Sequence, residues 1–278
     1  MNSIRKDFGI LEGETLLGSH NWDADKKLKL SQTVNFHGFL DNYSSVDILK
    51  FLCGELFLNR ILDFKSELSK NGIEGLALDI DETLSATSTY WFEKLLSIFG
   101  NPENLTAEQM ASKYHLCQNV PYWKGNTEIF DLMYKFREDN DFQTNIPIIE
   151  GTNLHYSKIH SEIISILSYI TVRPDVVVDG TSRWLDSHDF PKAELIHIPY
   201  ELEYLFGNLW KACVLDVLYP NIVGIVDDNP SLIKMLPQRY KGEIFLFNKK
   251  ELCDYSHINI HISENIEQVI RNIEKVFL

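Results

Sequence analysis

The feature that most constrains this chain is an apolar run ending in acidic residues, GLALDIDETLS at positions 75–85. Residues 76–78 lead directly into Asp79 and Asp81. A short apolar run is typical of a buried strand, and buried parallel strands deliver their last residues to one edge of a sheet. Two carboxylates at positions i and i+2 of an extended segment point to the same side, where they repel each other unless a cation or a shared proton offsets their charge. The pattern indicates a Mg²⁺ site, or an acid beside a nucleophile, at the end of a strand.

Two further apolar stretches end in polar residues that suit a phosphate site. Residues 168–171 predict a short strand ending in Thr171, and Arg173 follows two positions later. Residues 222–226 predict a strand that runs into paired acids at 227–228. Adjacent carboxylates at a buried strand end are costly without a cation, and Mg²⁺ prefers oxygen ligands of this kind. Taken singly, Thr171 also suits an ordinary strand end, and the acids also suit an Asp-Asn-Pro turn.

Together these segments resemble the motifs of the haloacid dehalogenase-like (HAD) superfamily of phosphatases and phosphotransferases. Residues 79–83 match its first motif, D-x-D-x-T, and residues 170–174, I-T-V-R-P, match its second. Lys211, directly before a predicted apolar helix, matches the third, and the acids at 227–228 match the fourth. Lys192 is a rival for the third motif, but it precedes the third predicted strand. Four matches in order and far apart make the resemblance specific.

The resemblance implies covalent catalysis. Asp79 would attack phosphorus and form an aspartyl-phosphate, while Asp81 would protonate the leaving oxygen and then activate water. Thr171 and Lys211 would hold the phosphoryl oxygens. The second aspartate favours phosphate over halide chemistry, because a halide leaves without a proton. Glu82 stands where many relatives have glycine, although D-x-D-E-T also occurs within the superfamily.

The resemblance also implies a cofactor and binding residues. Mg²⁺ would be bound by the carboxylates of Asp79 and Asp227 and by the backbone carbonyl of Asp81. The Asp228 carboxylate would assist. Thr83, from the first motif, is a predicted substrate contact. Arg173 would either bind the substrate phosphate bidentately or pair with a neighbouring acid.

Strands and helices alternate after residue 73, which predicts an α/β fold with a Rossmann-like, mainly parallel sheet as the HAD core. We expect residues 73–84 and 147–278 to form this core. Residues 85–146 predict helices in the position of a HAD cap, which closes over substrate and excludes water. Residues 1–72 predict a mostly helical N-terminal extension with a long helix from Ser45, unbroken or broken near Asn59. This extension is either a cover on the core or a partner-binding module, and its length favours the cover.

The predicted cap is rich in aromatic side chains, most of which suit its own small core. Tyr90 and Trp123 are the two for which we predict contact with the substrate by stacking. Residues 106–109, T-A-E-Q, predict a capping box, and Pro121 predicts the start of a helix that continues to residue 136. The remaining predicted elements are a strand at 34–39, helices at 153–167 and 181–187, a strand at 193–198, a loop at 199–210, a strand at 243–247 and a helix from 263.

Composition narrows the partners and the compartment. The formal net charge of −14 argues against a broad nucleic-acid footprint. No apolar run approaches about 18 residues and no leader is visible, so we expect a cytoplasmic protein outside the membrane. The four cysteines are far apart, which predicts no disulfide framework.

The leading hypothesis is a Mg²⁺-dependent phosphomonoesterase that acts on a small phosphorylated metabolite, with nucleotides among the candidates. A phosphotransferase or mutase would use the same residues with a hydroxyl acceptor instead of water. The alternative from a different class is a catalytically idle binding or scaffold protein of the same fold. The presence of every catalytic residue type argues against it.

Overall fold

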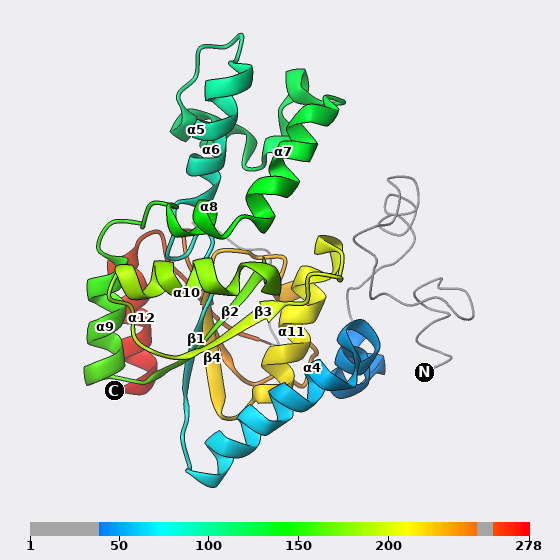
Figure 1. The fold of residues 1–278 in the computed structure, drawn as a ribbon. Helices are drawn as coiled ribbons and strands as arrows, with labels where there is room; N and C mark the ends of the chain where they lie inside the picture. Colours follow the sequence, from blue (N-terminus) through cyan, green and yellow to red (C-terminus); the bar gives the residue numbers. More distant parts are fainter. Residues whose placement is uncertain (1–38, 249–257) are drawn as a thin grey trace.

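The computed structural model describes residues 39–248 and 258–278, so the strand predicted at 34–39 lies outside the described residues except for its last position. Six strands form one all-parallel sheet in the order β3-β2-β1-β4-β5-β6 (Figure 1). The strands are β1 (Gly75–Leu78), β2 (Ile166–Pro174), β3 (Glu194–Ile198), β4 (Ile222–Asp227), β5 (Glu243–Leu246) and β6 (Asn259–Ile262). This order reverses direction around β1, which makes the core Rossmann-like and places a switch point at its carboxyl edge.

Strand β1 lies at the centre of the sheet because its short side chains are buried on both faces. Ala77 belongs to the hydrophobic cluster on one face, whereas Leu76 and Leu78 belong to the cluster on the other. Gly75 is required by a close approach, since a Cβ there would lie 2.3 Å from the carbonyl oxygen of Ser165. Burial on two faces explains why the sequence shows a continuous apolar run.

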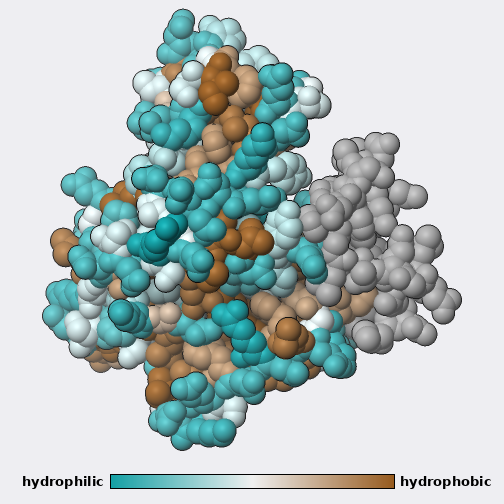
Figure 2. Space-filling model, in the orientation of Figure 1, coloured by the Kyte–Doolittle hydropathy of each residue, from teal (hydrophilic) through white to brown (hydrophobic). Residues whose placement is uncertain are grey.

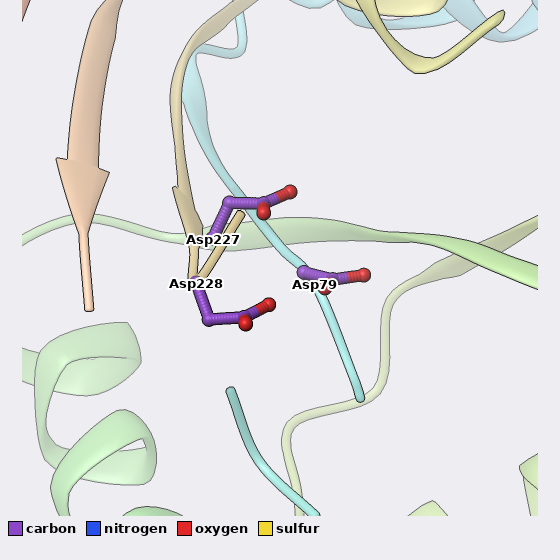
Figure 3. A group of neighbouring side chains, drawn as sticks. All are labelled: Asp79, Asp227 and Asp228. Carbon is purple, nitrogen blue, oxygen red and sulfur yellow. The ribbon is translucent and has the colours of Figure 1, made fainter. Parts of the chain in front are cut away.

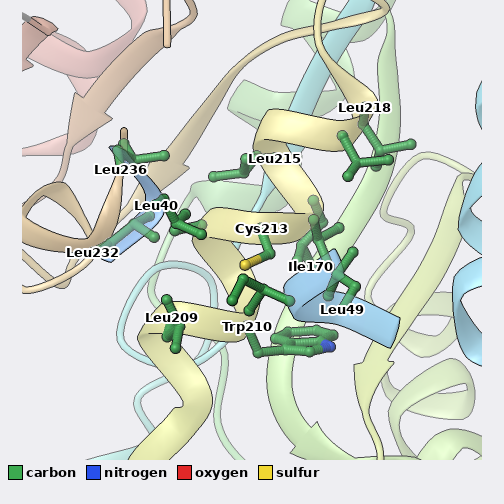
Figure 4. Packing of buried hydrophobic residues seen from close by; sticks show 14 of the residues in the cluster. Leu40, Leu49, Ile170, Leu209, Trp210, Cys213, Leu215, Leu218, Leu232 and Leu236 are labelled. Carbon is green, nitrogen blue, oxygen red and sulfur yellow. The ribbon is translucent and has the colours of Figure 1, made fainter. Parts of the chain in front are cut away.

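Helices cover both faces of the sheet (Figure 1). One face carries α11 (Gly207–Leu218), against which α4 (Ser45–Lys70) packs; Figure 4 shows Leu49 of α4 beside Trp210 and Cys213 of α11. The other face carries α9 (Thr152–Glu162), α10 (Val178–Ser187) and α12 (Ile266–Phe277).

The long N-terminal helix is interrupted, but at a different residue from the one we predicted. A short helix α3 (Phe39–Asn42) precedes α4, and the bend in α4 lies at Gly54, with φ 82°, instead of near Asn59. Glycine is the residue that adopts positive φ at little cost, so the bend falls where the chain permits it. Apolar spacing alone did not reveal this position because it continues on both sides of the bend.

The first part of the segment between β1 and β2, residues 87–144, is helical and extends away from the sheet (Figure 1). Its helices are α5 (Thr87–Phe99), α6 (Ala107–Tyr114), α7 (Thr127–Glu138) and α8 (Asn140–Thr144). We call residues 87–144 the insert; it has a hydrophobic cluster of its own that includes Phe92, Met110 and Ile129. The predicted capping box at Thr106 is confirmed. The prediction of one helix from Pro121 is wrong. A separate 3₁₀ turn (Pro121–Trp123) comes first, and α7 begins at Thr127, capped by Asn126.

Three further boundaries differ from the prediction. The helix predicted over 153–167 ends at Glu162, and Ile166 already belongs to β2. The predicted loop at 199–210 contains a 3₁₀ turn (Tyr204–Phe206) and the first turn of α11. The C-terminal helix begins at residue 266 rather than 263, capped by Asn265. The strands predicted at 193–198 and 243–247 match β3 and β5 to within one residue.

The surface shown in Figure 2 is mostly hydrophilic, with hydrophobic residues gathered between the insert and the sheet region. Within the described ranges, no helix combines the length and the apolar character needed to cross a bilayer. Cys53, Cys117 and Cys213 are buried and unpaired by disulfides.

Candidate active site

The residues singled out in the sequence meet at the carboxyl edge of the sheet. Asp79 directly follows β1, and Asp227 is the last residue of β4, the neighbouring strand. The backbone N–H of Asp79 donates to the carbonyl of Val226 at 2.9 Å, which ties the two strand ends together. Thr171 lies inside β2, on the other side of β1, where the Arg173 N–H donates to its hydroxyl at 3.2 Å. Ligand sites of open parallel sheets lie at this edge.

Three carboxylates form a compact acidic cluster at this edge. One carboxyl oxygen from each of Asp79, Asp227 and Asp228 lies within 4.8 Å of the others. Figure 3 shows the three groups directed to the same side of the strand ends. Asp79 and Asp227 are buried, and Asp228 is half-buried. Hard oxygen donors converging at this spacing fit a Mg²⁺ ion.

Lys211 is the cation of the site. Its Nζ lies 2.8 Å from Asp79 Oδ1 and 2.7 Å from Asp227 Oδ2, and the side chain is buried. Burial by itself lowers the pKa of Lys211, but Asp227 and Asp79 outweigh it and raise the pKa above its usual range. Lys211 sits in the second turn of α11, not at the helix start as predicted, because the helix begins four residues earlier.

The pKa of Asp79 is subject to opposing influences from burial and from neighbouring charges. Burial raises the pKa of Asp79 to about 7, and the charges of Asp227 and Asp81 act in the same direction. Lys211 opposes them but does not cancel them. A further cation in the cluster would favour the ionised carboxylate, the form that acts as a nucleophile.

Asp81 is paired with Arg173 and remains partly exposed. Arg173 Nε donates to the two carboxyl oxygens at 3.0 and 3.2 Å, and Nη2 donates at 2.7 Å. The Thr87 hydroxyl donates to Asp81 at 2.6 Å. Burial would raise the pKa of Asp81, but the guanidinium outweighs it and lowers the pKa. Of the two roles predicted for Arg173, the structure shows the pairing with a neighbouring acid. Its Nη1 remains buried without a hydrogen-bond partner.

Glu82 has a role that sequence analysis missed. Its backbone is left-handed, with φ 59°, which is strained for a residue with a side chain. Its Oε1 accepts a hydrogen bond from the Ser88 N–H at 2.6 Å, in the first turn of α5. Ala86, at the N-cap position of that helix, supplies no side-chain acceptor. Glu82 therefore caps α5, the first helix of the insert. The sequence signal for this role is that Ala86, at the N-cap position, cannot supply a capping side chain itself.

The predicted substrate contacts have different surroundings. Thr83 is buried, and its hydroxyl has no partner among the described residues. Tyr90 is half-buried, 4.9 Å from the Phe142 ring between centroids. Trp123 is 4% exposed and stacks on Phe92 in the cluster of the insert, which suits a core side chain better than a substrate contact. An aromatic side chain in a small helical insert contributes more by filling its core than by remaining exposed.

No protein-family model matches this chain, and no curated protein sequence is significantly similar to it. The interpretation of the site therefore depends on its residues and their geometry.

Proposed function

We propose that this protein is a Mg²⁺-dependent phosphomonoesterase of the HAD type that acts on a small phosphorylated metabolite through an aspartyl-phosphate. The observation that carries the proposal is the convergence of Asp79, Asp227, Asp228 and Lys211 from three separate elements at the switch point of a parallel sheet. In this proposal residues 73–84 and 147–278 are the catalytic core. The insert is its cap, and residues 1–72 are an N-terminal extension.

The cofactor would be held by oxygen ligands. These are the carboxylates of Asp79, Asp227 and Asp228 and the backbone carbonyl of Asp81. Bound there, Mg²⁺ would neutralise charge on the phosphoryl group and help to align it.

The residues of the chain account for each bond change. Ionised Asp79 attacks phosphorus, and the bond from phosphorus to the leaving oxygen breaks as Asp81 donates a proton to that oxygen. Asp81 then removes a proton from water, which attacks phosphorus and releases phosphate and free Asp79. Lys211 offsets the negative charge on the phosphoryl oxygens, and Lys211 and Thr171 together hold these oxygens in place.

Arg173 links substrate binding to the proton state of Asp81. In the free protein the guanidinium favours ionised Asp81, which suits the later role as a base but not the first role as an acid. A phosphoryl group offers Arg173 a doubly charged partner, and its Nη1 is an unused donor. Transfer of the guanidinium to the phosphoryl oxygens would raise the pKa of Asp81 and let it carry the proton.

The test is phosphate release by the wild type and Asp79→Asn, each with Mg²⁺ and with EDTA. A generic aryl phosphate and a panel of nucleotides and sugar phosphates would serve as substrates. Asp186→Asn, an exposed position on α10, is the matched control. We expect release to require Mg²⁺ and to fall at least about 10³-fold in Asp79→Asn only, since the nucleophile is lost. Transfer to added alcohols instead of water would assign a phosphotransferase. A folded wild type that releases nothing across the panel would sink the proposal in favour of a binding role.

A further inference from the structure

The last turn of α7 brings a second arginine to the core. The guanidinium carbon of Arg137 lies 5.4 Å from the centroid of the Tyr204 ring. Tyr204 begins the 3₁₀ turn directly before α11, the helix that carries Lys211. The next residue of α7, Glu138, accepts a hydrogen bond from the Tyr200 hydroxyl at 3.0 Å. Two adjacent side chains thus hold the end of α7 against the 200–206 segment.

Arg137 has no acidic partner in the part of the chain that the structure describes. Among the same residues its buried Nη2 atom has no hydrogen-bond partner. Arg173, in contrast, has its charge matched by Asp81. The Tyr204 ring attracts the guanidinium by a cation–π contact, which restrains the group without using any of its N–H donors. Arg137 is therefore held in place with unused donors, the arrangement that recognises a carboxylate or a phosphate.

The position of Arg137 relates it to the acidic cluster. Helix α7 contacts β2, the strand that carries Thr171 and Arg173. In Figure 1 the C-terminal end of α7 is the end of this helix nearer to the sheet. Tyr204 is half exposed, and its phenol is close enough to the site to feel the charge there. Partial burial raises the pKa of Tyr204, the charge of Asp81 raises it further, and the charge of Arg137 lowers it. The Arg137–Tyr204 pair thus lies where the insert meets the core, within electrostatic reach of Asp81 and Lys211.

We propose that Arg137, held on Tyr204, binds a second anionic group of the substrate, so that the preferred substrates are small phosphomonoesters with a further carboxylate or phosphate. This inference rests on the proposed phosphomonoesterase function. The first phosphoryl group would occupy the site at Asp79, and the second anion would occupy the insert side.

The kinetic test uses substrate pairs that differ in the second anion. 3-Phosphoglycerate and glycerol 3-phosphate test a carboxylate, and fructose 1,6-bisphosphate and fructose 6-phosphate test a phosphate. We expect Arg137→Gln to lower kcat/KM for the doubly anionic member by about 10- to 100-fold, mainly through KM, because a charge-assisted hydrogen bond is lost. The other member should change less than about threefold. Lys135→Gln, an exposed charge on the same helix, is the control and should change neither.

A binding test separates this inference from the proposed reaction. Propylphosphonate and 3-phosphonopropionate are not hydrolysed, and only the second carries a carboxylate. Calorimetry with the wild type in Mg²⁺ should show tighter binding of 3-phosphonopropionate, and Arg137→Gln should abolish the difference while Arg137→Lys keeps part of it. Equal binding of the two by the wild type, or equal losses in Arg137→Gln, would overturn the role of Arg137. Preferential binding without any phosphate release would keep this subsite and remove the phosphatase.

Discussion

Lys211 makes the clearest prediction about the stability of the site, because one buried ammonium serves two buried carboxylates. Lys211→Met keeps an unbranched side chain of similar length and removes the ammonium, with its charge and its N–H donors. Each contact, at 2.8 and 2.7 Å, corresponds to an attraction of about 6 kcal/mol at an effective dielectric constant of roughly 20. The ammonium gives up hydration worth several kcal/mol to make these contacts, so the net contribution is smaller than their sum.

The loss of unfolding free energy in Lys211→Met depends on the two carboxylates that are left without their cation. Asp79 and Asp227 have ligand oxygens within 4.8 Å of each other, a repulsion of about 3 kcal/mol at the same dielectric constant. Removal of one partner of a buried charge pair typically costs about 3–5 kcal/mol, and we expect that loss at pH 8. The pKa of Asp79 is already raised in the fold and rises further without Lys211. A raised carboxyl pKa lowers stability as pH increases, so the loss should be smaller at pH 5.

Urea unfolding followed by tryptophan fluorescence measures this change at both pH values. Mg²⁺ should stabilise Lys211→Met more than the wild type, because the ion supplies the missing positive charge; at about 100 times the dissociation constant it would restore about 2.7 kcal/mol. Lys158→Met is the control, since Lys158 is exposed and lies 3.9 Å from Glu162, and it should lose less than about 1 kcal/mol. A loss below about 1 kcal/mol in Lys211→Met at pH 8, or no response to Mg²⁺, would refute the reasoning.

Two further residues give stability predictions. Burial lowers the pKa of His197 to about 4, so its contribution to stability is lost as pH falls from about 6.5 through 4, by up to about 3 kcal/mol. His197→Gln should flatten the acid side of the stability profile measured by urea unfolding, and an unchanged slope would contradict this. Glu82→Ala should lower stability by about 1–2 kcal/mol, because it removes the cap on Ser88 and keeps the left-handed strain. Glu82→Gly should be more stable than Glu82→Ala by about 1 kcal/mol in thermal unfolding, and the reverse order would show that strain at this position is unimportant.

The parts of the fold that followed from the sequence are those with strong local signals. Strands β1 and β4 were predicted because both are buried on two faces and both end in acids. Thr106 and Gln109 formed their capping box because that motif needs only neighbouring residues. The predicted helix at 153–167 extends beyond the real one because the isoleucines at 163, 164 and 166 suit a buried helix and a buried strand equally. The start of α11 was missed because Phe206, at its N-cap position, offers no side-chain cap.

What the sequence by itself determined was the kind of groups at the site and the edge of the sheet at which they meet, because parallel strands place all their carboxyl ends together. Tertiary structure alone decided how those groups pair. Arg173 could have faced the site or an acid, and it contacts Asp81, 92 positions away. The cation–π contact of Arg137 with Tyr204 likewise joins the insert to a core segment. Contacts of this kind depend on how separate elements pack, and that information lies in no local stretch of the chain.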